Sequence, residues 1–134
     1  MIKKQYYQER IISHDNQTLV LHHWPIKQPK VLIHLIHGMS EHGYRYNELG
    51  KWLNQKQIYA YSLDLRGHGR TAKNIDSIGI FSSKNGWEKV ILDIKIITEK
   101  ISTQFTDIPT VILGHSMGSF LARELAIKFP NLSN

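Results

Sequence analysis

The sequence predicts an α/β fold in which a mostly parallel sheet has helices on both faces. Short apolar runs, typical of buried strands, alternate along the chain with segments whose apolar residues recur every three or four positions. The run at 31–36 (VLIHLI) is almost continuously apolar, as expected for a strand that is covered on both faces. Because parallel strands need a crossover connection that is usually helical, this alternation favours a parallel sheet.

The first half of the chain is expected to contain four strands and one helix. The apolar runs that predict the strands lie at 6–12, 18–24, 31–36 and 58–63. The first two are expected to be joined by a turn at Asp15 and Asn16, residue types that favour turns. The segment 46–56 is predicted to be a helix, because its apolar residues share one helical face.

The second half is expected to contain a loop, a helix, a strand and a second helix. In that order, the predicted elements lie at 66–85, 87–105, 110–113 and 117–129. The first of these helices has one apolar face, because its isoleucine and aromatic residues recur at steps of three or four. Pro109 and Pro130 follow the two helices, and proline cannot continue a helix.

Composition places the chain among ordinary globular proteins. It has 134 residues, of which 41% are hydrophobic and 21% charged, and it is interpreted as one domain over 1–134. The absence of cysteine excludes a disulfide framework, a thiolate zinc site and a cysteine nucleophile. The net charge is +6, but the basic residues are spread along the chain, so a nucleic-acid partner is not expected.

The sequence also predicts the localisation of the protein and the absence of membrane helices and cofactors. No apolar run approaches the roughly 20 residues of a membrane helix. The basic N-terminal segment 1–10 is not followed by the apolar stretch of a secretory signal. We therefore expect a cytoplasmic protein without stable membrane insertion. No metal or organic cofactor is expected, since the eight histidines lack metal-ligand spacing.

A G-x-S-x-G motif stands between a predicted strand and a predicted helix, at residues 114–118. This context is typical of a nucleophile elbow. So tight a turn leaves no room for side chains at Gly114 and Gly118, and it holds the serine in a strained conformation that exposes the hydroxyl. The free N–H groups at the start of the helix favour a developing oxyanion. The motif therefore predicts Ser116 as a catalytic nucleophile.

A second motif, His37-Gly38, directly follows the buried strand 31–36. In this architecture one oxyanion donor comes from the loop at this place and the other from the residue after the nucleophile. The backbone N–H groups of Met39 and Met117 are therefore the predicted donors. His37 and His42 are expected to cap or pack rather than to transfer protons.

A third glycine-containing segment, DLRGHGR at 64–70, follows the strand 58–63. Its two closely spaced glycines allow a tight loop beside the same edge of the sheet. Asp64 and Arg66 are expected to form structural hydrogen bonds there. No catalytic role is expected for Asp64 or His68.

The segments HGMSEHGYRY (37–46), DLRGHGRT (64–71) and GHSMGS (114–119) together resemble the α/β-hydrolase superfamily. They resemble the branch that holds monoacylglycerol lipases, lysophospholipases and serine aminopeptidase-like "hydrolase 4" proteins, and the resemblance extends from about residue 10 onward. It implies a serine hydrolase of carboxylic esters, with a monoacylglycerol-like or lysophospholipid-like substrate and an acyl-enzyme on Ser116. The residues implied to support the elbow and its neighbouring loop are Gly114, His115, Gly118, His37 and Gly38.

The rest of the catalytic triad is expected to lie elsewhere. In this fold the acid and the histidine follow the serine in the chain. The 18 residues after Ser116 contain neither histidine nor aspartate. Glu124 lies roughly 12 Å away along the same helix, too far to assist. The sequence is therefore interpreted as the N-terminal part of such a domain, truncated before its late strands and lid, and as inactive alone.

The same resemblance places the strand 110–113 in the middle of a complete sheet. Without a further strand beside it, this apolar strand would be an open edge. The sequence therefore predicts self-association, or pairing with another chain, through residues 110–113.

Three other interpretations remain open. The nucleophile and oxyanion motifs do not distinguish an ester hydrolase from an amide or peptide hydrolase of the proline-iminopeptidase type. The chain could also rebuild its site with a separate C-terminal chain. Finally, it could be a non-catalytic interaction fragment, in which Ser116→Ala would change nothing.

Overall fold

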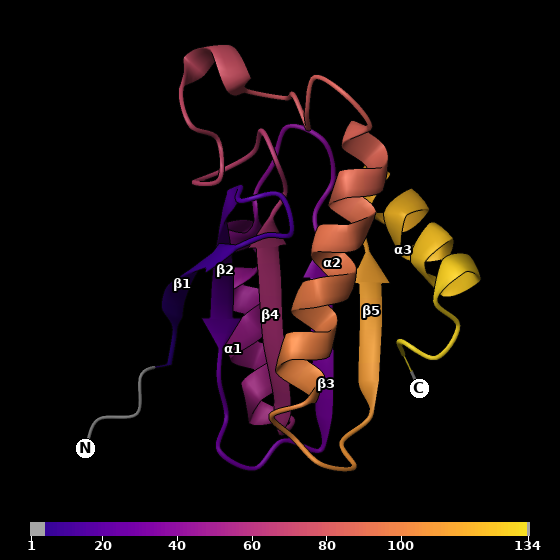
Figure 1. Ribbon diagram of the computed structural model, residues 1–134. Helices are drawn as coiled ribbons and strands as arrows, with labels where there is room; N and C mark the ends of the chain where they lie inside the picture. Colours follow the sequence, from indigo (N-terminus) through magenta and orange to yellow (C-terminus); the bar gives the residue numbers. More distant parts are fainter. Residues whose placement is uncertain (1–4, 134) are drawn as a thin grey trace.

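A five-stranded sheet forms the centre of the computed structural model, which describes residues 5–133 (Figure 1). Its strands are β1 (Tyr7–Ile12), β2 (Thr18–Trp24), β3 (Val31–Ile36), β4 (Ile58–Asp64) and β5 (Thr110–Gly114), in the spatial order β1-β2-β4-β3-β5. β2 is antiparallel to both neighbours, whereas β3 is parallel to β4 and to β5. Four of the five strands therefore run in one direction, which confirms the mostly parallel sheet. Residues 1–4, part of the N-terminal segment considered above, lie outside the described residues.

Helices cover both faces of the sheet, as predicted. They are α1 (Asn47–Gln55), α2 (Gly86–Ser102) and α3 (Met117–Lys128), with short 3₁₀ helices η1 (Gly43–Tyr46) and η2 (Ile75–Ser77). Figure 1 shows α2 in front of the sheet and α1 behind it. The two 3₁₀ helices were not predicted. The prediction was also wrong about the end of α2, which stops at Ser102, although Phe105 still packs against the core.

The alternation of side chains along each strand divides the core into two layers. In β3, Leu32 and Ile36 belong to the cluster that contains the buried residues of α2 and α3. Ile33 and Leu35 belong to the cluster that contains Leu53 of α1. Because successive side chains of a strand point to opposite faces, an almost wholly apolar strand is needed to serve both layers.

β5 lies at one edge of the sheet. It pairs with β3, and within residues 5–133 no strand pairs with its other side. Val111 and Leu113 are 39% and 43% exposed. The predicted open, apolar edge is therefore present in the described part of the chain.

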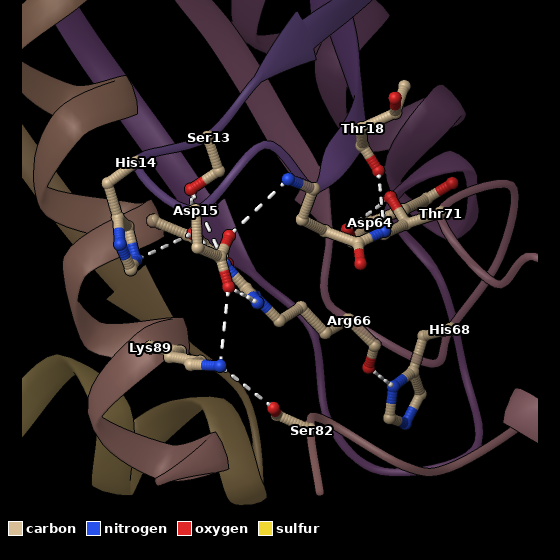
Figure 2. Close-up of polar contacts among 12 residues, drawn as sticks. Ser13, His14, Asp15, Thr18, Asp64, Arg66, His68, Thr71, Ser82 and Lys89 are labelled. Carbon is tan, nitrogen blue, oxygen red and sulfur yellow. Dashed lines mark hydrogen bonds and ion pairs between the residues drawn. The ribbon is translucent and has the colours of Figure 1, made fainter. Parts of the chain in front are cut away.

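A buried network of ion pairs joins the β1–β2 turn to α2 and to the loop after β4 (Figure 2). Arg66 donates through Nε to Asp93 Oδ2 at 2.6 Å and through its terminal nitrogens to Asp15 at 2.7 and 2.8 Å. Ser13 Oγ also donates to Asp93. The hydrogen bonds from Arg66 hold the pKa of Asp15 well below its usual range. The structural role expected for Arg66 is therefore confirmed.

Three buried histidines are held in their neutral form. Burial lowers the pKa of His34 to about 3 and those of His23 and His37 to about 4. His34 lies in β3 and its Nδ1 is 2.9 Å from Thr98 Oγ1. Because that hydroxyl donates its own hydrogen to the Ile94 carbonyl, it accepts from the His34 Nδ1–H. The imidazole is thus a neutral packing group at the centre of the sheet.

These histidines predict a loss of stability in mild acid. A histidine whose pKa is lowered in the folded state binds protons more tightly in the unfolded state, so its contribution is complete above about pH 6.5 and declines as the pH falls toward 3. We expect His34→Leu to flatten the fall in the free energy of unfolding between pH 6.5 and 4.5, measured by urea titration at several pH values. An unchanged slope in the variant would contradict the assignment.

Candidate active site

The G-x-S-x-G motif forms a sharp turn between β5 and α3. Ser116 has φ 53° and ψ −121°, a combination that side-chain-bearing residues rarely adopt. His115 N–H donates to the Ile36 carbonyl at 3.0 Å, and this bond extends the β3–β5 pairing into the turn. The strained elbow geometry predicted for Ser116 is therefore present, and its role as a nucleophile stays a prediction.

Both glycines of the motif are required by close backbone approach. A Cβ atom added to Gly114 would overlap the carbonyl oxygen of Gly118 and lie 2.7 Å from Ser119 N. One added to Gly118 would overlap the Ile36 carbonyl and lie 2.7 Å from the His37 carbonyl oxygen. The first turn of α3 therefore packs directly on the end of β3, as the tight-turn argument predicts.

The loop after β3 reaches the elbow. A Cβ atom added to Gly38 would lie 3.0 Å from Ser116 Cβ and 3.2 Å from the His115 carbonyl oxygen. Met39 follows Gly38, and Met117 begins α3. Backbone hydrogen bonds within the described residues leave the N–H groups of Met39 and Met117 unused. The loop that carries Met39 thus reaches the elbow, and the role of the two N–H groups as oxyanion donors stays a prediction.

Glu41 fastens this loop to the elbow, a role that the sequence reasoning missed. Its Oε1 accepts from the Gly38 N–H at 2.5 Å and lies 3.1 Å from His115 Nδ1, while its Oε2 is 3.6 Å from Arg45 Nε. Burial acts to raise the pKa of Glu41, but the hydrogen bonds from Gly38 and His115 outweigh it, so the pKa is lowered. The only signal in the sequence was a carboxylate three residues after Gly38, at the spacing of a side chain that closes a turn.

The two histidines of this loop have different surroundings. His37 is buried, donates from Nδ1 to the Gly38 carbonyl at 2.7 Å and accepts from the Leu65 N–H at Nε2, at 3.0 Å. Both nitrogens are engaged, so the packing role predicted for His37 is confirmed. The expectation that His42 caps or packs was wrong. His42 precedes η1, but its side chain is exposed and makes no capping hydrogen bond, while the Gly43 N–H donates to Asp64.

Asp64 forms structural hydrogen bonds with the backbone, as predicted, and His68 does so as well. Asp64 is buried, accepts from the N–H groups of Gly43 and Arg70 at 2.7 and 2.8 Å, and lies 2.9 Å from His22 Nε2. His68 is buried and donates from Nδ1 to the Arg66 carbonyl at 2.9 Å. These contacts connect the loop after β4 to the loop after β3.

Glu124 lies away from the serine, as predicted. It accepts from Trp87 Nε1 and is 2.5 Å from Lys128 Nζ. The contact with Trp87 joins α3 to α2, so the Glu124 carboxylate is bound to these two helices and not to the serine.

A hollow of about 440 Å³ lies beside the loop after β3. Its lining includes Ser40, Glu41 and His42 from the loop after β3, and Gly67, Asn74 and Ile78 from the segment after β4. Across residues 5–133, no cluster of three histidine, aspartate or glutamate side chains is arranged to hold a metal ion. The helices of this same range are too short or too polar to cross a bilayer.

Comparison with known proteins gives a consistent result. Residues 27–133 match the family Hydrolase_4, described as serine aminopeptidase, S33. A monoglyceride lipase homolog of Monkeypox virus is 33% identical over 119 residues, covering 88% of this chain and 41% of that protein. The monoglyceride lipase of Mus musculus is 30% identical over 121 residues, covering 90% and 38%.

Solved structures show the same fold. A lipase in an open form superposes with a TM-score of 0.82 at 30% identity, covering 96% of this chain and 41% of that chain. A carboxyl esterase from Bacillus coagulans superposes with a TM-score of 0.84 at 24% identity, covering 96% and 42%, and supports the fold alone. The chain spans about 40% of the length of the first curated relatives that it matches.

Proposed function

The chain belongs to the serine aminopeptidase S33 family of α/β hydrolases, and we propose on this basis that it carries the nucleophile and oxyanion donors of a carboxylic-ester hydrolase. The observation that supports this most is the strained Ser116 at the start of α3, with the loop that carries Met39 packed against the elbow. The proposed substrates are monoacylglycerol-like or lysophospholipid-like esters. Similarity to proteins named monoglyceride lipase, and to the phospholipase YtpA of Bacillus subtilis, supports that class.

The proposed reaction has two steps. Ser116 Oγ attacks the ester carbonyl carbon while a base takes its proton, and the N–H groups of Met39 and Met117 stabilise the oxyanion. Collapse of this intermediate breaks the bond to the alcohol, which leaves with the proton, and forms an acyl-serine. Water then attacks the acyl-serine, releases the carboxylic acid and restores the hydroxyl.

The base is not assigned to a residue of this chain. The order of the triad in this fold places the histidine after the serine, whereas both nitrogens of His37 are already engaged. We therefore propose that the 134 residues alone hydrolyse esters only at a residual rate, because an unassisted serine is a weak nucleophile.

Fluorophosphonate labelling tests the role of Ser116. In a lysate of the source cells, we expect a labelled protein heavier than 15.6 kDa to yield the Ser116 peptide, and the purified chain to stay unlabelled. Ser116→Ala in the labelled protein should abolish labelling, whereas Ser83→Ala, in an exposed loop, should not. Labelling that persists in Ser116→Ala would refute the proposed nucleophile. Labelling at 15.6 kDa would show that a base is supplied to this chain.

Amide hydrolysis is the second candidate reaction, because the matched family is described as serine aminopeptidase. An ester and an aminoacyl anilide offered to the labelled protein distinguish the two. We expect hydrolysis of the ester. Cleavage of the anilide with the ester untouched would favour the proline-iminopeptidase type.

We also propose that the open edge of β5 pairs with a strand of another chain. The exposed Val111 and Leu113 make this edge apolar. The purified chain is expected to self-associate with rising concentration in sedimentation velocity, and Val111→Lys to reduce this. Ile127→Lys is the matched control, since Ile127 is an exposed apolar residue of α3. A monodisperse monomer at micromolar concentration would contradict the proposal.

A further inference from the structure

Three isoleucine side chains are exposed to solvent on one short segment, which we call the isoleucine loop (residues 73–80). Ile75, Ile78 and Ile80 are 81%, 64% and 54% exposed. Single exposed apolar residues are ordinary, but an exposed group of them indicates a binding surface. Nothing in the packing of this loop requires isoleucine at these positions, because the side chains contribute little to the core.

Hydrogen bonds hold the isoleucine loop in this conformation. Asn74 and Ser77 form a reciprocal capping box around η2, and the Gly79 N–H donates to the Gly67 carbonyl at 2.7 Å. Ile78 directly follows η2, and its N–H donates to the Ile75 carbonyl at 3.3 Å, so this turn places the two residues close together. The loop is therefore built to present these side chains outward.

The position of the loop relates it to the candidate active site. Figure 1 shows η2 projecting beyond the end of the sheet at which β5 leads into the elbow. Asn74 and Ile78 line the 440 Å³ hollow together with Ser40 and Glu41. A surface that binds to this loop would therefore lie close to the hollow.

The charge of the surrounding segment indicates what that surface is. Residues 67–85 contain three cationic side chains, Arg70, Lys73 and Lys84, and one carboxylate, Asp76. All three cations are exposed, and none of them forms an ion pair within residues 5–133. The Arg70 guanidinium donates to the neutral side chain of Gln8 at 2.9 Å. Apolar tips flanked by free cations fit an anionic phospholipid surface, where apolar side chains enter the acyl boundary and cations meet phosphates.

We propose that the isoleucine loop docks this chain on the surface of anionic phospholipid bilayers. Ile75 and Ile78 insert at the boundary between headgroups and acyl chains, and Lys73 and Lys84 contact headgroup phosphates. This docking is peripheral and is consistent with the lack of a membrane-spanning helix in the described range. It does not rest on the proposed ester hydrolysis, because binding to vesicles requires no turnover.

Co-sedimentation with vesicles tests the proposal on the purified 134-residue chain. We expect binding to phosphatidylcholine vesicles containing about 30% phosphatidylserine to be at least about 10-fold tighter than to phosphatidylcholine alone, and to weaken with added salt. The variant Ile75→Ser/Ile78→Ser/Ile80→Ser is expected to bind about 10-fold more weakly or worse. Lys73→Glu/Lys84→Glu should remove the preference for anionic vesicles.

Two controls keep the result specific to the loop. Ile127→Ser removes an isoleucine that is 80% exposed on α3, and it should leave binding unchanged. Circular dichroism should show that each variant is folded, and the single variant Ile75→Ser provides a milder test. The proposal is overturned if the chain binds neither vesicle, which would indicate that the isoleucines face other protein. It is also overturned if the triple variant binds as tightly as the parent, or if Ile127→Ser loses binding equally.

Discussion

Replacing Asp93 with alanine is expected to lower the free energy of unfolding by about 3–5 kcal/mol, because the buried Arg66 loses its closest partner. Asp15, in the turn between β1 and β2, still accepts from the two terminal nitrogens of Arg66. The Nε atom would lose its acceptor, and Nη2 would lose its hydrogen bond to Asp93 Oδ1. The total free energy of unfolding of a small domain is only about 5–15 kcal/mol. Urea titration at pH 7 should therefore show a far lower midpoint, or no folded baseline.

Two further variants show whether the stability lost in Asp93→Ala comes from leaving the buried Arg66 charge unpaired. Arg66→Met combined with Asp93→Leu leaves no ionised group at the centre of the pair, so it should recover part of the stability. Lys95→Ala breaks a partly exposed pair with Glu99 on the same helix, together with a cation–π contact to Phe129, and should cost only about 1 kcal/mol. A loss in Asp93→Ala no larger than that in Lys95→Ala would show that the buried network contributes little.

Replacing Gly118 with alanine is expected to cost about 3 kcal/mol, at the upper end of the range for overpacking. The new methyl group would collide with the carbonyl oxygens of Ile36 and His37. Backbone atoms cannot rotate away as a flexible side chain can, so the start of α3 must move off β3. The Met117 N–H and Ser116 move with it. Fluorophosphonate labelling of the heavier protein that contains the Ser116 peptide should therefore fall together with its stability.

Gly79→Ala is the matched control. Gly79 has φ +76° and no atom within 4 Å of an added Cβ, so its substitution is expected to cost only about 1 kcal/mol, for the left-handed backbone conformation. The difference between the two variants isolates the close approach of α3 to β3. Equal losses in thermal or urea unfolding would show that this approach is not a constraint.

The fold could be predicted from local pattern to within a few residues. The continuous apolar run of β3 and the single apolar face of α2 each require a particular neighbour, so their periodicity predicts both the element and its burial. Phe105 shows the limit of this reasoning. It continues the helical spacing and joins the core, yet it lies beyond the end of α2, because a residue can reach the core from a turn as well as from a helix.

The elbow was also predictable from the sequence, because its constraints are local. A strand, two glycines and a helix within a few residues leave one backbone path for Ser116. Glu41 and His42 were not predictable in this way. Glu41 turns toward His115 of the elbow, which lies far away in sequence, whereas the His42 side chain has no such partner in the described part of the chain.

The sequence by itself determined the order of the main helices and strands, the place of the elbow and the need for glycine around Ser116. These properties follow from periodicity and from steric limits that act over a few residues. Only the tertiary structure decided that Arg66 is shared between Asp15 and Asp93, that Glu41 joins two loops, and that the isoleucines of residues 73–80 face solvent. Each of these depends on which distant segments meet, and hydrogen bonds and burial are properties of the pair rather than of either residue.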